Sequence, residues 1–165
     1  MSVRRILIAV STSRYSRKLV GLAIREAEQF REAGDTVEID VLTVIEEEAL
    51  ARAAASVGDS GLLGLEAQEQ VLATLGAEHN RMARKRVAQV EVAAAQRGFE
   101  VVRYEAQGDF VDLVLARAEA LHADVILLSR AERPFISRIL FGSVADKVAR
   151  LARRDGLGRV VIQDT

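Results

Sequence analysis

Short apolar runs alternate with segments of helical periodicity along most of the chain. The runs at residues 6–10, 37–44, 100–106, 125–128 and 160–162 predict five β-strands, and the first and fourth are typical of strands covered on both faces. Between them, apolar residues recur at helical spacing, as at Val20, Ala23, Ala27 and Phe30, and four helices are expected. This alternation predicts an α/β fold with a doubly wound parallel sheet and helices on both faces.

Polar residues mark the expected starts of these helices. Ser13 or Ser16 is placed to cap the first helix, and Asp109 to cap the helix that follows the third strand. Ser143 with Asp146 resembles a capping box at the start of the last helix. We therefore interpret these side chains first as helix caps.

Residues 46–80 do not fit the alternation, because they are too many for an ordinary connection. A clear helical stripe returns only with Ala83, Val87, Val90 and Ala94. The segment carries seven acidic residues against Arg52, whereas residues 130–159 carry seven arginines and Lys147 against three acids. Two solvated helix faces explain this contrast. The alternatives are an acidic flap over a basic loop, or an insertion whose leucines dock a protein partner.

Composition narrows the class of protein. The 165 residues fit one domain spanning 1–165, and the net charge of −1 argues against broad binding to nucleic acid. There is no cysteine for a disulfide or a thiolate metal site, and His79 and His122 lack a second ligand at metal spacing. The apolar run at residues 6–10 is too short to insert into a membrane. We expect a cytoplasmic protein without a metal.

The fourth strand leads through a loop to Gly142 and Ser143, where the last helix begins. In an α/β protein this is the usual place to hold an anion or a nucleotide. Candidate binding residues are Ser11, Ser129, Arg130, Gly142 and Ser143, and the further loop arginines are Arg133 and Arg138. For Ser143 a helix cap is the favoured interpretation, and for the arginines a solvated surface. Turn and cap chemistry explains Ser11 as well as ligand binding does.

With these features in view, the chain resembles the universal stress protein family. The resemblance rests on residues 6–10 with the serine-rich turn after them, on Gly108-Asp109, and on residues 123–128. Its most specific part is residues 136–148, Ile-Ser-Arg-Ile-Leu-Phe-Gly-Ser-Val-Ala-Asp-Lys-Val. The resemblance implies strand order 3-2-1-4-5 and a homodimer formed through the last strand, at Val160, Val161 and Ile162.

Members of that family that hold ATP carry the pattern Gly-x2-Gly-x9-Gly-Ser/Thr after the fourth strand. Here Ser129 and Glu132 stand at the first two glycine positions, and Ser11 stands where those members usually have aspartate. A carboxylate about 4 Å from a phosphate costs roughly 4 kcal/mol at an effective dielectric near 20, or about a thousandfold in affinity. We therefore expect no ATP cofactor.

The sequence thus predicts a non-enzymatic, homodimeric stress-response regulator with no catalytic residues. It offers no base, nucleophile and charge-stabilising group in one constellation. Two alternatives stay open. One is an ATP or AMP sensor, or a slow ATPase, that uses Gly142, Ser143 and the loop arginines. The other is a binder of another small anionic metabolite beside Ser11 and Ser129.

Overall fold

A computed structural model describes residues 1–11, 14–46, 55, 58, 64–130 and 143–164 of the chain. Its five strands form one parallel sheet in the order β3-β2-β1-β4-β5, which confirms the order implied by the family resemblance. The strands are β1 (Val3–Ser11), β2 (Thr36–Glu46), β3 (Val101–Gly108), β4 (Val125–Ser129) and β5 (Arg159–Gln163). The helices are α1 (Arg17–Glu32), α3 (Leu65–Ala95), α4 (Phe110–Leu121) and α6 (Val144–Arg154).

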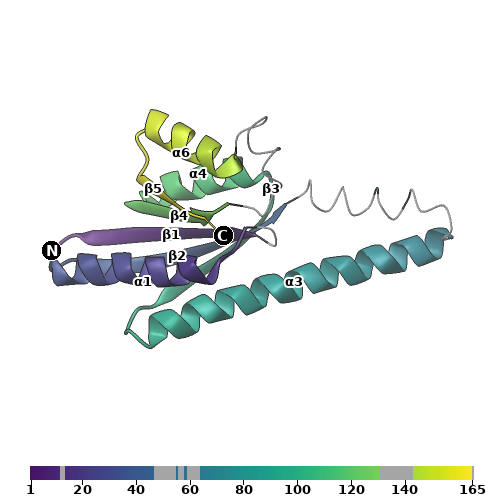
Figure 1. The fold of residues 1–165 in the computed structure, drawn as a ribbon, viewed down its shortest axis with the longest axis horizontal. Coiled ribbons are helices and arrows are strands. Elements are labelled where there is room, and N and C mark those ends of the chain that lie inside the picture. The colour runs from purple at the N-terminus through teal and green to yellow at the C-terminus, as the bar shows by residue number, and fades with distance from the viewer. Residues whose placement is uncertain (12–13, 47–54, 56–57, 59–63, 131–142, 165) are drawn as a thin grey trace.

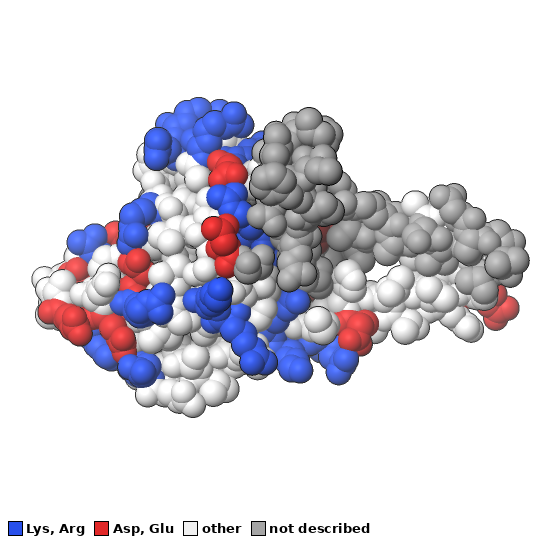
Figure 2. Space-filling model, viewed as in Figure 1, with Lys and Arg blue, Asp and Glu red and all other residues white. Residues whose placement is uncertain are grey.

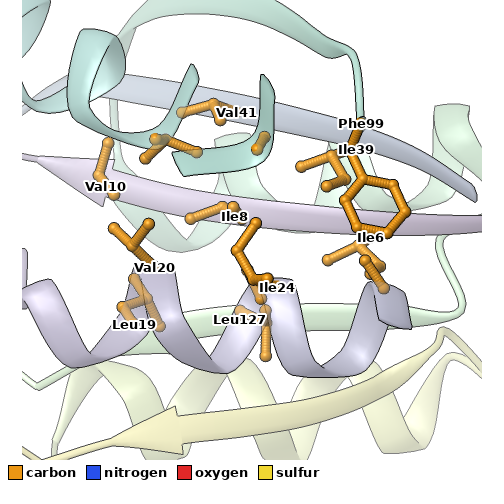
Figure 3. Packing of buried hydrophobic residues seen from close by; sticks show 14 of the residues in the cluster. Ile6, Ile8, Val10, Leu19, Val20, Ile24, Ile39, Val41, Phe99 and Leu127 are labelled. Atoms are coloured by element: carbon orange, nitrogen blue, oxygen red, sulfur yellow. The ribbon is translucent and has the colours of Figure 1, made fainter. Parts of the chain in front are cut away.

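The core lies on both faces of this sheet. One cluster packs α1 and α3 against the side chains of Ile6, Ile8 and Val10, as Figure 3 shows. A second cluster packs α4 and α6 against the opposite face of β1, at Leu7 and Ala9. All five of these β1 residues are at most 1% exposed, because a central parallel strand must be covered on both sides. The layered arrangement is visible in Figure 1.

The predicted caps are confirmed in three helices. Ser16, Asp109 and Ser143 are the N-caps of α1, α4 and α6, and each side chain accepts a hydrogen bond from a backbone N–H two or three residues later. These bonds satisfy donors that the first turn of a helix leaves without an intrahelical partner. The caps also place the start of each helix at the carboxyl edge of the sheet.

The long helix begins well before the apolar stripe that the sequence shows from Ala83. The helix α3 begins at Leu65 and contains 31 residues, so residues 65–80 of the proposed insertion are helical. No residue of 65–82 is buried, whereas Ala83, Val87, Val90 and Ala94 are. The apolar stripe in the sequence therefore marks only the half of α3 that packs against the sheet. The first half of the helix extends beyond the sheet (Figure 1). The rest of the 46–80 segment lies largely outside the described residues.

The charged stretches form exposed helix surfaces wherever they are described. Glu66, Glu69 and Glu78 are exposed on α3, and three arginines of α6, Arg150, Arg153 and Arg154, are exposed as well. Figure 2 shows basic side chains gathered over α6. The described parts of both charged stretches are therefore consistent with solvated helix faces. Among the described helices, none is long and apolar enough to span a membrane.

We predict opposite effects of alanine at two glycines. A Cβ at Gly158 would lie 2.1 Å from the backbone oxygen of Ala123, so Gly158→Ala should lower the free energy of unfolding by about 3 kcal/mol. Gly76, inside α3, has open space at its Cβ position, so Gly76→Ala should raise stability by about 0.5–1 kcal/mol. Urea unfolding followed by circular dichroism measures both, and equal effects would contradict this packing.

Candidate functional site

The candidate site lies at the carboxyl ends of the strands, where the chain leaves the sheet in two directions from β1 and β4. In doubly wound sheets this switch point is the usual ligand crevice. Ser11 ends β1 and Ser129 ends β4, and Ala9 pairs with Leu128 just before them. The two serines are 1% and 0% exposed, so both belong to the interior of this edge.

Although the two serines end neighbouring strands, the structure does not bring their side chains together. Successive side chains of a strand point to opposite faces of its sheet. Ser11 shares a face with Ala9, toward α4 and α6, and Ser129 shares the other face with Leu127, toward α1 and α3. The hydroxyl of Ser129 is buried and has no hydrogen-bond partner in the described part of the chain. The sequence predicted that the two strands end side by side. To line one pocket, however, the two serines would also have to lie on the same face of the sheet.

Glu46 joins Ser11 to an arginine, a contact that sequence reasoning missed. The Ser11 hydroxyl donates to Glu46 Oε2 at 2.8 Å, and Arg14 Nε donates to Glu46 Oε1 at 3.2 Å. The side chains of Arg14 and Glu46 are only 5% and 13% exposed, and the Arg14 guanidinium lies 5.1 Å from the centre of the Phe110 ring. This buried ion pair fills the edge between β1, β2 and the start of α4.

The signal that could have found this contact is the length of β2. The sequence-based strand stopped at Val44, and Glu46 was assigned to the acidic segment that follows. The observed strand continues to Glu46, and its register pairs Val44 with Ser11. Residues two apart on a strand share a face, so Glu46 points to the same side of the sheet as Val44 and Ser11.

A second arginine that the sequence did not single out supports the end of β1 from α3. Arg86 donates through Nη1 to the backbone oxygen of Ser11, and its guanidinium lies 5.0 Å from the centre of the Tyr15 ring. The Tyr15 hydroxyl donates to Gln89 of the same helix. Burial lowers the pKa of Arg86 and raises the pKa of Tyr15. These contacts fix the turn from β1 into α1.

A pocket of about 270 Å³ opens beside the buried ion pair. Its walls include Arg14, Glu46, Asp109, Phe110 and Lys147, from the ends of β1 and β2 and the first turns of α4 and α6. Among the described residues, two basic and two acidic side chains face it, so their formal charges cancel. The pocket could hold a small polar molecule, but these four side chains together offer no net charge to an anion.

At the first turn of α6, the candidate anion ligands bind one another. The hydroxyl of Ser143 donates to Asp146 Oδ2 at 2.6 Å and accepts from Arg130 Nη1 at 2.6 Å and from the Asp146 N–H at 3.0 Å. Arg130 also bonds Asp146 Oδ2 at 2.6 Å and Asp164 Oδ1 at 2.7 Å, and its N–H donates to the Gln163 carbonyl. A hydroxyl has one donor and two acceptor positions, so all three of Ser143 are engaged.

The ion pair between Arg130 and Asp146 shifts the pKa of both side chains toward their charged forms. Hydrogen bonds from Arg130 and Ser143 lower the pKa of Asp146, and the Asp146 carboxylate raises the pKa of Arg130. Asp146 is therefore ionised at neutral pH and adds negative charge where the first turn of a helix attracts an anion. We call Arg130, Ser143, Asp146 and Asp164 the α6 lock.

Some predicted residues stand outside this picture. Gly142, Glu132, Arg133 and Arg138 lie outside the described residues. His79 lies on α3, and His122 is the C-cap of α4 with a φ of 50°. Within residues that are described, no group of three or more histidine, aspartate or glutamate side chains could hold a metal ion.

We predict that the same charge removal has different costs in two ion pairs. Glu46→Gln leaves Arg14 buried without its carboxylate and should lower the free energy of unfolding by about 3 kcal/mol. Glu38→Gln removes the exposed partner of Arg5 and should cost less than about 1 kcal/mol. Chemical unfolding of both variants measures the difference, and a Glu46→Gln protein as stable as Glu38→Gln would rule out a structural role for the pair.

Comparison with known proteins agrees with this architecture. Over residues 2–155 the sequence matches the profile of the Universal stress protein family. The comparison with curated protein sequences gives no significant match. Among solved structures, a universal stress protein in complex with cAMP aligns with a TM-score of 0.59 and 18% identity, covering 98% of this chain and 97% of the other.

Two further structures have a similar fold. A protein from the universal stress protein family of Burkholderia pseudomallei aligns with a TM-score of 0.58 and 12% identity, over 96% of this chain and 94% of its own. A universal stress protein from Archaeoglobus fulgidus aligns with a TM-score of 0.56 and 17% identity, over 96% and 92%. At these identities the likeness concerns the fold, and the profile match carries the assignment: the chain belongs to the universal stress protein family.

Proposed function

We propose that this stress-response protein acts without catalysis, as a homodimer, and does not retain ATP. The observation that carries the proposal is the α6 lock. Its serine hydroxyl has no position left for a phosphate oxygen, and the guanidinium of Arg130 is bound by two carboxylates. A nucleotide would have to break these contacts before it could use the same groups.

The cost of that exchange supports the proposal. A phosphate about 4 Å from the Asp146 carboxylate would be repelled by roughly 4 kcal/mol at an effective dielectric near 20, which is about a thousandfold in affinity. Glu132 stands in the loop before α6, at a position where ATP-holding relatives have glycine, and is a second acid in this part of the sequence besides Asp146. The described walls of the remaining pocket beside Arg14 carry two basic and two acidic side chains.

A nucleotide sensor or slow ATPase is the second candidate. The solved relative in complex with cAMP favours it, since that protein has the same fold. In this chain a nucleotide would use Gly142, Ser143 and the loop arginines, with Lys147 at the pocket wall. The unpartnered hydroxyl of Ser129 favours a third candidate, a small polar or anionic metabolite, which mass spectrometry of the purified protein would detect.

The outer edge of β5 supports the homodimer. Val160, Val161 and Ile162 are half-buried in the single chain. An apolar sheet edge that is left uncovered tends to pair with another strand, because its backbone groups are unpaired. Antiparallel pairing around Val161 would set Val160 against Ile162 of a second copy. The exposed first half of α3, with Leu65 at 81% exposure, is the surface we propose for a protein partner.

We predict that ATP with magnesium leaves the melting temperature of the wild-type protein unchanged. A ligand at a hundredfold of its Kd stabilises a protein by about 2.7 kcal/mol, a rise of roughly 5–10 °C for a chain of this size. The variant Ser129→Gly/Glu132→Gly/Asp146→Asn restores the glycine pattern and removes the carboxylate of the α6 lock, and it should gain a rise with ATP. Glu132→Gln, which keeps the bulk, is the matched control. A clear rise in the wild type would favour the nucleotide sensor.

For the dimer, we predict that Ile162→Lys halves the mass of the species at low protein concentration, measured by light scattering after gel filtration. A charge on this edge must be desolvated when the second copy pairs. Val92→Lys, on the exposed surface of α3, should leave the mass unchanged. If Ile162→Lys keeps the wild-type mass while remaining folded, the β5 edge is not the interface.

A further inference from the structure

The opposite edge of the sheet, β3, has the features of a second pairing edge. Its outer side has no strand partner among the described residues, since the sheet order ends there. The strand is eight residues long and contains no proline, which is one of the usual devices that block edge pairing. Its centre, Val102 to Glu105, is exposed along its whole length.

Two apolar side chains are exposed on one face of this edge. Val102 and Tyr104 are 48% and 40% exposed, and strand alternation puts both on the face that α4 covers. They are among the few large apolar residues that the described chain leaves exposed. A partner that extends the sheet would cover them.

Tyr104 is held in place before any partner binds. The guanidinium carbon of Arg117 lies 3.0 Å from the centre of the tyrosine ring, and Arg117 Nη2 bonds Asp40 Oδ1 at 3.0 Å. Asp40 is 3% exposed on β2, so the arginine is anchored in the interior. An exposed aromatic ring that is already ordered loses little conformational freedom on binding, which is typical of an interface anchor.

The order of residues around Tyr104 is complementary to itself. In an antiparallel pair centred on this tyrosine, Arg103 stands opposite Glu105 of a second copy, and Glu105 opposite its Arg103. Within its own chain Arg103 bonds Glu91 of α3 through Nε and Nη2, so Glu105 of the second copy would meet its remaining Nη1. On the other face, Val102 stands opposite Ala106 and the two tyrosines meet. Opposite charges and apolar pairs facing each other are the contacts that stabilise neighbouring strands.

We propose that β3 is an isologous interface, at which a second copy of this chain pairs antiparallel about a twofold axis at Tyr104. Shifted registers are worse. Centring the pair on Arg103 sets arginine against arginine, and centring it on Glu105 sets glutamate against glutamate. A one-residue slip sets charged side chains against apolar ones. One register is therefore favoured, as a specific contact between two identical surfaces requires.

This interface is independent of the dimer proposed at β5, because the two strands lie at opposite edges of the sheet. A single strand pair with its flanking side chains is a small contact area, and small interfaces form at high protein concentration. The two edges together would join β5 dimers into larger assemblies as concentration rises.

Sedimentation velocity over a concentration series tests the pairing. The wild-type protein should associate beyond the dimer, and Glu105→Arg, which sets two arginines opposite each other twice, should require about tenfold more protein for the same association. Arg103→Glu/Glu105→Arg exchanges the charges and should restore it. Both sites are exposed, but Arg103 also bonds Glu91 of α3, so far-ultraviolet circular dichroism checks that both variants fold. A wild-type mass that never exceeds one β5 dimer, or equal association of the single and double variants, would overturn the proposal.

The same series separates the two edges. If the β5 dimer is wrong, the wild-type protein is a monomer at low concentration, and any dimer at high concentration still responds to Glu105→Arg. Disulfide trapping gives the register, because the chain has no cysteine. Tyr104→Cys stands opposite itself across the axis and should cross-link on oxidation, whereas Val102→Cys stands opposite Ala106 and should not. Cross-linking of Val102→Cys at the same rate would exclude this register.

Discussion

The burial of β1 on both faces is the constraint on which the rest of the structure depends. Five consecutive apolar residues from Ile6 to Val10 can leave water only if helices cover both sides of the strand. That requirement sets α1 and α3 against α4 and α6, and it brings the polar ends of the strands together at one edge. It also leaves β3 and β5 as the two edges of the sheet.

At the carboxyl edge, carboxylates of the chain itself bind several polar side chains, with the buried hydroxyl of Ser129 as the exception among the described residues. The carboxylate of Glu46 accepts hydrogen bonds from Arg14 and Ser11. The carboxylate of Asp146 accepts hydrogen bonds from Arg130 and Ser143. An open anion site would leave donors of this kind unpaired until a ligand arrived. Here internal carboxylates bind Arg14 and Arg130, and this pairing supports the proposal that the crevice does not retain ATP.

The sequence predicted what depends on local pattern. The five strands, the caps at Ser16, Asp109 and Ser143, and the apolar stripe of α3 follow from periodicity and side-chain type. The start of α3 did not follow, because its first half is helical without being buried. The pairing of Glu46 with Arg14 joins residues 32 apart, which only the assembled sheet brings into contact. Arg130 was read as a possible phosphate ligand, and only the geometry reveals that two carboxylates bind it.

A crystal structure grown with ATP and magnesium tests the central claim most directly, because it reports the contacts of the α6 lock and any bound nucleotide together. The account predicts Arg130 bonded to Asp146 and Ser143, with no nucleotide beside the first turn of α6. Triphosphate seated against Ser143, with Arg130 turned from Asp146 to the phosphate, would contradict it.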